Sequence, residues 1–107
     1  MLVMLLLALA GPNPHPLDRP RKAYSACIHS FEARSLAAKM DAGAYSTALK
    51  AMCTAEAAAL ARALTDYDVA MGTKRADALL TANSDVADYR VTSEERFRDL
   101  MTPAKGN

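Results

Sequence analysis

Two cysteines, Cys27 and Cys53, are the residues of this 107-residue chain whose chemistry is easiest to define. Each lies on the apolar face of a segment with helical periodicity, so the two thiols can point at one another. In an oxidising compartment, a pair of cysteines in a small chain with a weak alanine-rich core is typical of a stabilising disulfide. We therefore expect a disulfide between Cys27 and Cys53.

The spacing of the cysteines fits an antiparallel helical hairpin. Bridged residues in such a hairpin lie equally far from the turn, and the midpoint of positions 27 and 53 is residue 40, within a few residues of the turn expected at 40–44. A disulfide needs Cα atoms closer than about 7 Å. The axes of packed helices are usually roughly 8–10 Å apart. Small side chains near the cysteines permit this approach, namely Ala23, Ala26 and Ala57.

A metal or haem site is the rival interpretation of the cysteines, because His29 follows Cys27 by two positions. Residues two apart on a helix point about 200° away from each other and cannot hold one ion. The chain contains no CxxC, CxxCH or HExxH motif, and no base is positioned to activate a thiol. We therefore predict no metal, no cofactor and no enzymatic activity, with His15 and His29 as solvated residues.

Glu56 is a carboxylate on the apolar face of the second predicted helix. A buried acid at this position could bind a ligand or titrate. It could also be a core-edge carboxylate that accepts a hydrogen bond from the hydroxyl of Tyr24 or from Arg21. We expect the second arrangement, with Glu56 and Tyr24 as a buried polar pair.

The first nineteen residues indicate export. Residues 1–10 are uncharged and apolar, too few to span a bilayer but typical of a signal peptide, with Ala8 and Ala10 suited to cleavage after Ala10. No Lys or Arg precedes this run, so the true start could lie upstream of Met1; a buried helix of a cytosolic protein is the alternative. Residues 11–19 are proline-rich and predict an extended spacer.

The remaining chain predicts a single all-α domain over residues 20–102, followed by a loose tail at 103–107. The hairpin helices are expected at about 20–40 and 45–71, with Gly43 and Gly72 as stops. One or two shorter C-terminal helices follow, because the turn-like residues 83–85 interrupt the pattern and residues 92–95 resemble a capping box. These shorter helices are expected to pack on the hairpin.

An apolar stripe on the second helix extends beyond the reach of the first and is a possible binding surface: Leu60, Leu64, Tyr67 and Met71. The C-terminal helices are our first expectation for its cover, and a second copy of the chain, giving a homodimer, is the other. The covering side chains would come from Leu79, Leu80, Val86, Tyr89, Phe97 and Leu100.

The charge balance argues against a nucleic-acid partner. Thirteen Lys and Arg face twelve Asp and Glu, giving a formal net charge of +1 with the charges interspersed. A nucleic-acid binder needs a basic patch that neutralises phosphates. We expect a protein partner instead, and contact with a membrane only transiently, through the signal peptide.

The layout resembles small uncharacterised exported helical proteins of Gram-negative bacteria: a signal peptide, Ala26-Cys27 on a first helix, and Ala51, Cys53 and Glu56 on a second. The resemblance covers about residues 22–72 and implies the hairpin and the disulfide, but no activity or cofactor. The expected function is that of a non-catalytic binding or structural protein of the cell envelope, in the periplasm or outside the cell. The alternative is an envelope stress or chaperone-like protein that opens to expose its apolar stripe.

Overall fold

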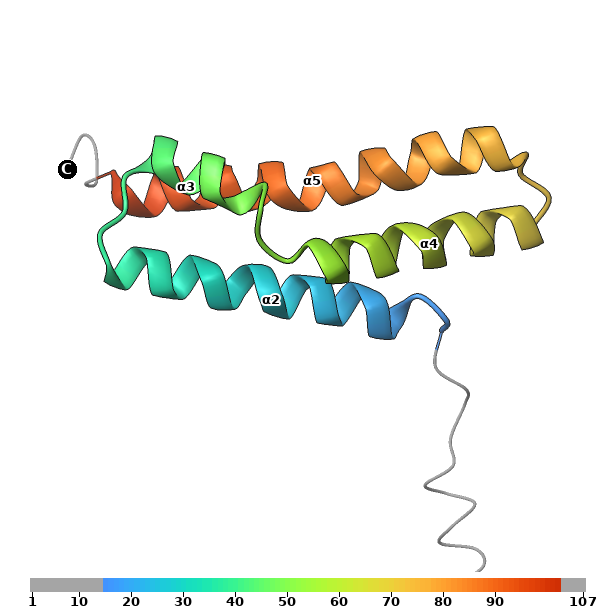
Figure 1. Cartoon of the computed structure of the whole chain (residues 1–107), viewed down its shortest axis with the longest axis horizontal. Helices are drawn as coiled ribbons and strands as arrows, with labels where there is room; N and C mark the ends of the chain where they lie inside the picture. The colour runs from blue at the N-terminus through green and yellow to red at the C-terminus, as the bar shows by residue number, and fades with distance from the viewer. Residues whose placement is uncertain (1–14, 103–107) are drawn as a thin grey trace, which may run out of the picture.

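A computed structural model describes residues 15–102, and this part of the chain is helical, which confirms the all-α class. Its helices are α2 (Asp18–Ala37), α3 (Ala42–Leu49), α4 (Thr54–Ala70) and α5 (Arg75–Met101). In Figure 1, α3 and α4 follow one another along the long helix α5, which runs antiparallel to both, and α2 runs parallel to α5. The predicted signal peptide, the first part of the spacer and the tail at 103–107 lie outside the described residues.

Helix α2 begins inside the predicted spacer. The backbone N–H of His15 donates to the Asp18 carboxylate (3.2 Å), and the N–H of Leu17 donates to Nδ1 of His15 (3.1 Å). These bonds satisfy donors next to the helix start. Leu17 itself is buried in the core, so residues 15–17 pack against the bundle and the extended spacer does not reach residue 19.

The end of α2 differs from the prediction of a stop at Gly43. The helix ends at Ala37, and Lys39 adopts a left-handed conformation (φ 56°). The N–H of Met40 then donates to the carbonyl of Ser35 (3.0 Å), which caps the last turn. Gly43 lies within α3, where Asp41 is the N-cap and accepts from the N–H of Ala44 (3.0 Å).

The predicted second helix at 45–71 is broken, and this corrects the simple two-helix hairpin. Helix α3 ends at Leu49, and Cys53 has left-handed backbone angles (φ 58°, ψ 29°) directly before α4. Good helix formers occupy the gap, so local propensity does not explain the break. The break lies at the disulfide, which holds the Cα atoms of Cys27 and Cys53 5.9 Å apart. The expected stop at Gly72 (φ 105°) is confirmed.

The C-terminal part is one helix of 27 residues, so the predicted turn at residues 83–85 and the capping box at 92–95 are wrong. Asn83 and Ser84 project into solvent from the helix, while Ala82 and Val86 beside them are buried. Packing of this face against α4 holds the helix together through residues that favour turns when exposed. The buried positions of α5 recur along one face, at Ala78, Ala82, Val86, Ser93 and Phe97.

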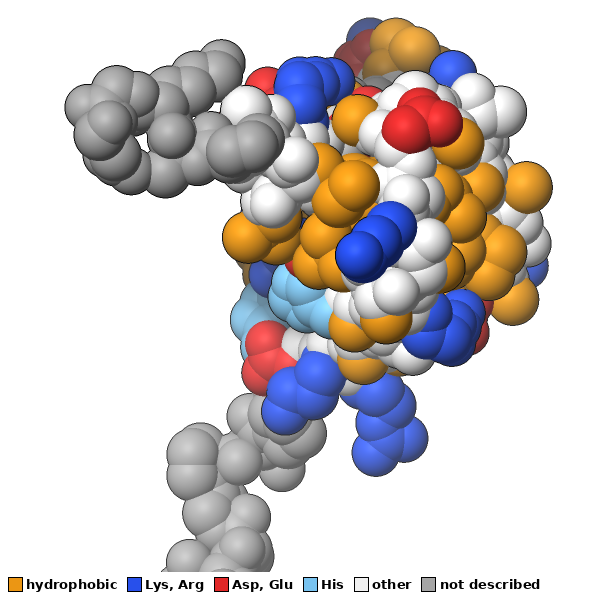
Figure 2. Space-filling view, turned by 90° about the vertical axis from the view of Figure 1, so that its left-hand side faces the viewer, with side chains coloured by type: hydrophobic (Ala, Val, Ile, Leu, Met, Phe, Trp, Pro, Cys, Tyr) orange, Lys and Arg blue, Asp and Glu red, His pale blue; other side chains and the backbone are white. Residues whose placement is uncertain are grey.

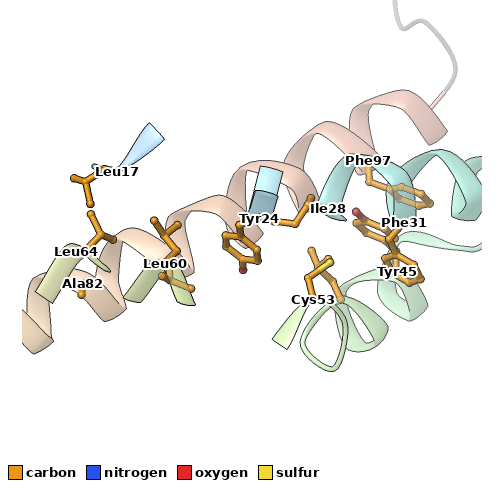
Figure 3. Packing of buried hydrophobic residues seen from close by; sticks show 12 residues of the cluster. Leu17, Tyr24, Ile28, Phe31, Tyr45, Cys53, Leu60, Leu64, Ala82 and Phe97 are labelled. Atoms are coloured by element: carbon orange, nitrogen blue, oxygen red, sulfur yellow. The ribbon is translucent and has the colours of Figure 1, made fainter. Parts of the chain in front are cut away.

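The core follows the length of the bundle (Figure 3). Leu17, Leu64 and Ala82 meet at one end, and Phe31, Tyr45 and Phe97 meet at the other. Tyr24 and Ile28 of α2 lie between these groups, near the disulfide. Three aromatic rings therefore stack where α2, α3 and α5 meet, and the buried Glu32 and Ser93 lie beside them.

Candidate functional site

A buried polar cluster joins α2, α3 and α5 at the aromatic end of the core. Glu32 of α2 accepts hydrogen bonds from Arg96 and Ser93 of α5, and the Ser93 hydroxyl is also bonded to the hydroxyl of Tyr45 in α3 (2.7 Å). Glu32 retains 7% of its surface, and Ser93 and Tyr45 are fully buried. The cluster thus satisfies its polar atoms and ties three helices together.

The Arg96–Glu32 ion pair is bidentate. Nε of Arg96 lies 2.9 Å from Oε1 of Glu32, and Nη2 lies 2.8 Å from Oε2. The Arg96 side chain keeps 38% of its surface exposed, whereas that of Glu32 keeps 9%. The pair therefore has a buried carboxylate and a guanidinium whose outer edge reaches solvent.

Stacked aromatic rings fix the position of the cluster. The Tyr45 ring is stacked between Phe97, at 3.9 Å between centroids, and Phe31, at 5.4 Å. This stacking leaves the Tyr45 hydroxyl at a defined place beside Ser93. The short helix α3 places two side chains in the core, Tyr45 and Leu49.

The electrostatics of the cluster favour the ion pair. Burial by itself would raise the pKa of Glu32, but hydrogen bonds from Arg96 and Ser93 outweigh burial and hold that pKa below its ordinary value. The hydrogen bond to Glu32 raises the pKa of Arg96 despite its partial burial. Burial raises the pKa of the Tyr45 phenol, so this hydroxyl is neutral and can donate. The cluster is therefore one buried anion with a matched cation.

An open groove of about 340 Å³ lies between α2 and α5, next to the ion pair. Its lining combines charged and hydroxyl side chains with apolar ones: Ser25, Ile28 and His29 from α2, and Asp88, Tyr89 and Arg96 from α5. Both histidines of the chain are exposed, and histidine side chains are visible on one flank in Figure 2, beside acidic and basic ones. This groove is one place where the described residues could hold a small ligand.

The disulfide predicted from the sequence is confirmed. Cys27 and Cys53 are bonded to each other, and Cys53 is buried in the core. The bridge fastens the start of α4 to the middle of α2. It lies apart from the polar cluster and is a structural element of the fold.

The apolar stripe predicted as a possible binding surface is largely covered by α5, in line with the first expectation for its cover. Leu60 and Leu64 are buried in the core against α5, and Tyr67 is half-buried with its ring 5.0 Å from that of His15. Met71, in contrast, is 70% exposed. The stripe is therefore not an open groove at Leu60 and Leu64.

Most of the residues that were expected to cover the stripe do not do so. Small side chains of α5, Ala78 and Ala82, approach α4 closely, together with Val86. Leu79, Leu80 and Leu100 are exposed. Phe97 is buried, but against Tyr45 and not over the far end of α4. Alanines on α5 allow the two helix backbones to come together around Leu60 and Leu64 of α4.

The expected buried pair of Glu56 and Tyr24 is only half correct. Tyr24 is buried and packs on the Tyr89 ring (5.2 Å between centroids). Glu56 is half-buried in the first turn of α4, where a carboxylate complements the positive end of the helix dipole. In the described part of the chain, neither Tyr24 nor Arg21 donates a hydrogen bond to it.

Sequence reasoning missed the carboxylate that is buried. Glu32 follows Ile28 by four residues, so it falls on the same face of α2 as the apolar residues. That spacing was the available signal for the burial of Glu32. The sequence gives no signal for its partners, because Ser93 lies in a segment typical of a helix start, and Arg96 is 64 residues away along the chain.

No helix within residues 15–102 combines the length and apolar character needed to cross a membrane, and in the same residues no group of three or more His, Cys, Asp and Glu is placed to hold a metal ion. No protein-family model, curated protein or solved structure matches the chain.

Proposed function

We propose that the protein is exported and acts in the periplasm or outside the cell as a non-catalytic binding or structural protein of the cell envelope. The observation that carries this proposal is the Cys27–Cys53 disulfide, which joins α2 to the start of α4. Disulfides persist in oxidising compartments and are rare in the cytosol. The apolar run at residues 1–10 supports the same location.

The disulfide also accounts for how so small a core is stabilised. It closes a loop with a sequence separation of 26 residues, and a crosslink of that length stabilises a domain by roughly 3–4 kcal/mol. This is a large part of the 5–15 kcal/mol or so that is usual for a folded domain. A protein that relies on this bond needs a compartment that keeps the bond oxidised.

Intact mass of protein recovered from separate cell fractions tests the proposal. We expect a species that begins at Gly11, found in the envelope or medium, with both thiols blocked to alkylation until reductant is added. A variant with Leu5→Arg and Leu6→Arg is the matched control, because it interrupts the apolar run and should stay in the cytoplasm. Parent protein that stays in the cytoplasm, keeps Met1 and has two free thiols would reject the proposal.

A second candidate is an envelope stress or chaperone-like protein that opens to expose its core. The observation that favours it is the Arg96–Glu32 pair, since a neutralisable carboxylate joins α2 to α5. An apolar dye and sedimentation at several concentrations, followed from pH 8 to pH 3, test this candidate. Dye binding with self-association at acid pH supports opening, and a dye-silent monomer throughout rejects it.

A further inference from the structure

We infer that the groove between α2 and α5 binds a short zwitterionic peptide of about three residues, with its carboxylate at Arg96 and His29 and its ammonium group at Asp88. This inference rests on the proposed binding function and names the ligand class for it. Along the α5 wall of the groove, Asp88 and Arg96 lie eight positions apart with the Tyr89 ring and the Thr92 hydroxyl between them. The two ends and the wall between them each have their own support in the structure.

The carboxylate end is built around the outer edge of Arg96. Nε and Nη2 of this side chain are held by Glu32, whereas Nη1 makes no hydrogen bond to a described residue. The guanidinium is thus fixed in place and still has donors for a second carboxylate. His29 adds a further donor from α2, and the Thr92 hydroxyl lies on the same wall.

The ammonium end is built around Asp88. Its side chain is exposed and lines the groove, and in the described part of the chain it takes part in no ion pair. The Ser25 hydroxyl of α2 also lines the groove. Because α2 and α5 run parallel (Figure 1), and Tyr24 packs on Tyr89 while Glu32 pairs with Arg96, Ser25 lies toward the Asp88 end.

The distance between the ends selects the length of the ligand. Asp88 and Arg96 are eight positions apart on α5, which is about 12 Å along the axis of a helix. Three extended residues span about 10 Å, so the charged termini of a tripeptide reach both ends. Between them, the half-buried Tyr89 ring and the exposed Thr92 side chain line the groove and can contact a central side chain.

Calorimetric titration of the oxidised full chain with Ala-Leu-Ala tests the inference. We expect saturable binding to the parent protein. N-acetylation of the peptide should weaken binding about 10-fold by removing the ammonium group, and amidation of its C-terminus should weaken binding at least as much. Equal binding of the free and blocked peptides, or no saturable binding of Ala-Leu-Ala, overturns the inference.

Two variants of α5 link the ammonium group to its proposed partner. Asp88→Asn should weaken Ala-Leu-Ala about 10-fold and leave the affinity of the acetylated peptide unchanged. Asp99→Asn is the matched control, since Asp99 is an exposed carboxylate of the same helix that does not line the groove, and it should change neither. Asp88→Asn protein that binds both peptides like the parent overturns the assignment.

The two proposals fail in different ways. Protein that is found in the envelope with its disulfide intact, yet does not bind the peptide, removes only the ligand assignment. Protein that binds the peptide but stays reduced in the cytoplasm contradicts the proposed location and supports the ligand assignment of the groove.

Discussion

At the scale of single residues, Glu32 links three helices of the bundle through hydrogen bonds. It is buried at the junction of α2, α3 and α5, and its carboxylate is matched by Arg96 and Ser93. Removing one partner of such a pair leaves an uncompensated charge in the core, and this costs more than the pair contributes when it is intact.

Arg96→Leu should therefore destabilise the protein by roughly 2–4 kcal/mol, somewhat less than for a fully buried pair because Arg96 is partly exposed. The double variant Glu32→Leu with Arg96→Leu should recover most of this loss, since both charges are then absent. Urea unfolding followed by circular dichroism measures both. A single variant as stable as the parent would contradict the role given to the ion pair.

The same pair makes stability depend on pH. Because the pKa of Glu32 is lowered in the folded protein, its contribution is complete above the unfolded pKa, about 4.3 for a glutamate. The contribution is lost as the pH falls through the folded value. In Arg96→Leu, burial without the cation raises the pKa of Glu32, so acid relieves the buried charge. The difference in unfolding free energy between parent and variant should narrow from pH 6 to pH 3, and a constant difference would count against this account.

At the scale of elements, the helices are interrupted at other positions than the sequence predicts. A break is predicted in the C-terminal part, where α5 is continuous, and none is predicted near Cys53, where the backbone turns left-handed. Packing of Ala82 and Val86 against α4 overrides the weak helix propensity of residues 83–85, and the break before α4 lies at the disulfide.

Ser84 provides a direct test of the continuous helix. Ser84→Pro should cost about 3 kcal/mol or more, because proline in a helix interior removes a backbone hydrogen bond and clashes with the preceding turn. Ser84→Ala, at the same exposed site, should stabilise by up to about 0.5 kcal/mol. Thermal unfolding of the two variants compares them. If residues 83–85 formed a turn, proline would be tolerated there.

At the scale of the whole molecule, α5 is the element that closes the core. It contacts α2, α3 and α4, and Figure 1 shows it extending along the whole bundle. Apolar side chains still appear across the end of the molecule in Figure 2, and Met71, Leu79 and Leu80 are exposed elsewhere. Within the predicted stripe, the buried Leu64 and the exposed Met71 can therefore be compared by mutation.

Leu64→Asp and Met71→Asp form a matched pair on this stripe. The first places an unpaired charge in a site that is 6% exposed and should cost about 3–5 kcal/mol. The second places it at a site that is 70% exposed and should change stability by no more than about 0.5 kcal/mol. Melting temperatures measured side by side check the prediction. Similar small effects at both sites would show that α5 does not cover Leu64.

The sequence by itself determined the helical class, the pairing of Cys27 with Cys53 and the end of α4 just before Gly72. These follow from local periodicity, a positive-φ requirement and the equal distance of both cysteines from a turn. The tertiary structure alone decided that the second helix breaks before Cys53, that α5 continues through residues 83–85, and that Glu32 is the buried acid. Each of these lies at a contact with a residue far away along the chain: Cys27, the facing residues of α4, or Arg96. Local residue patterns contain no information about such partners, because their contributions appear only once the helices are packed.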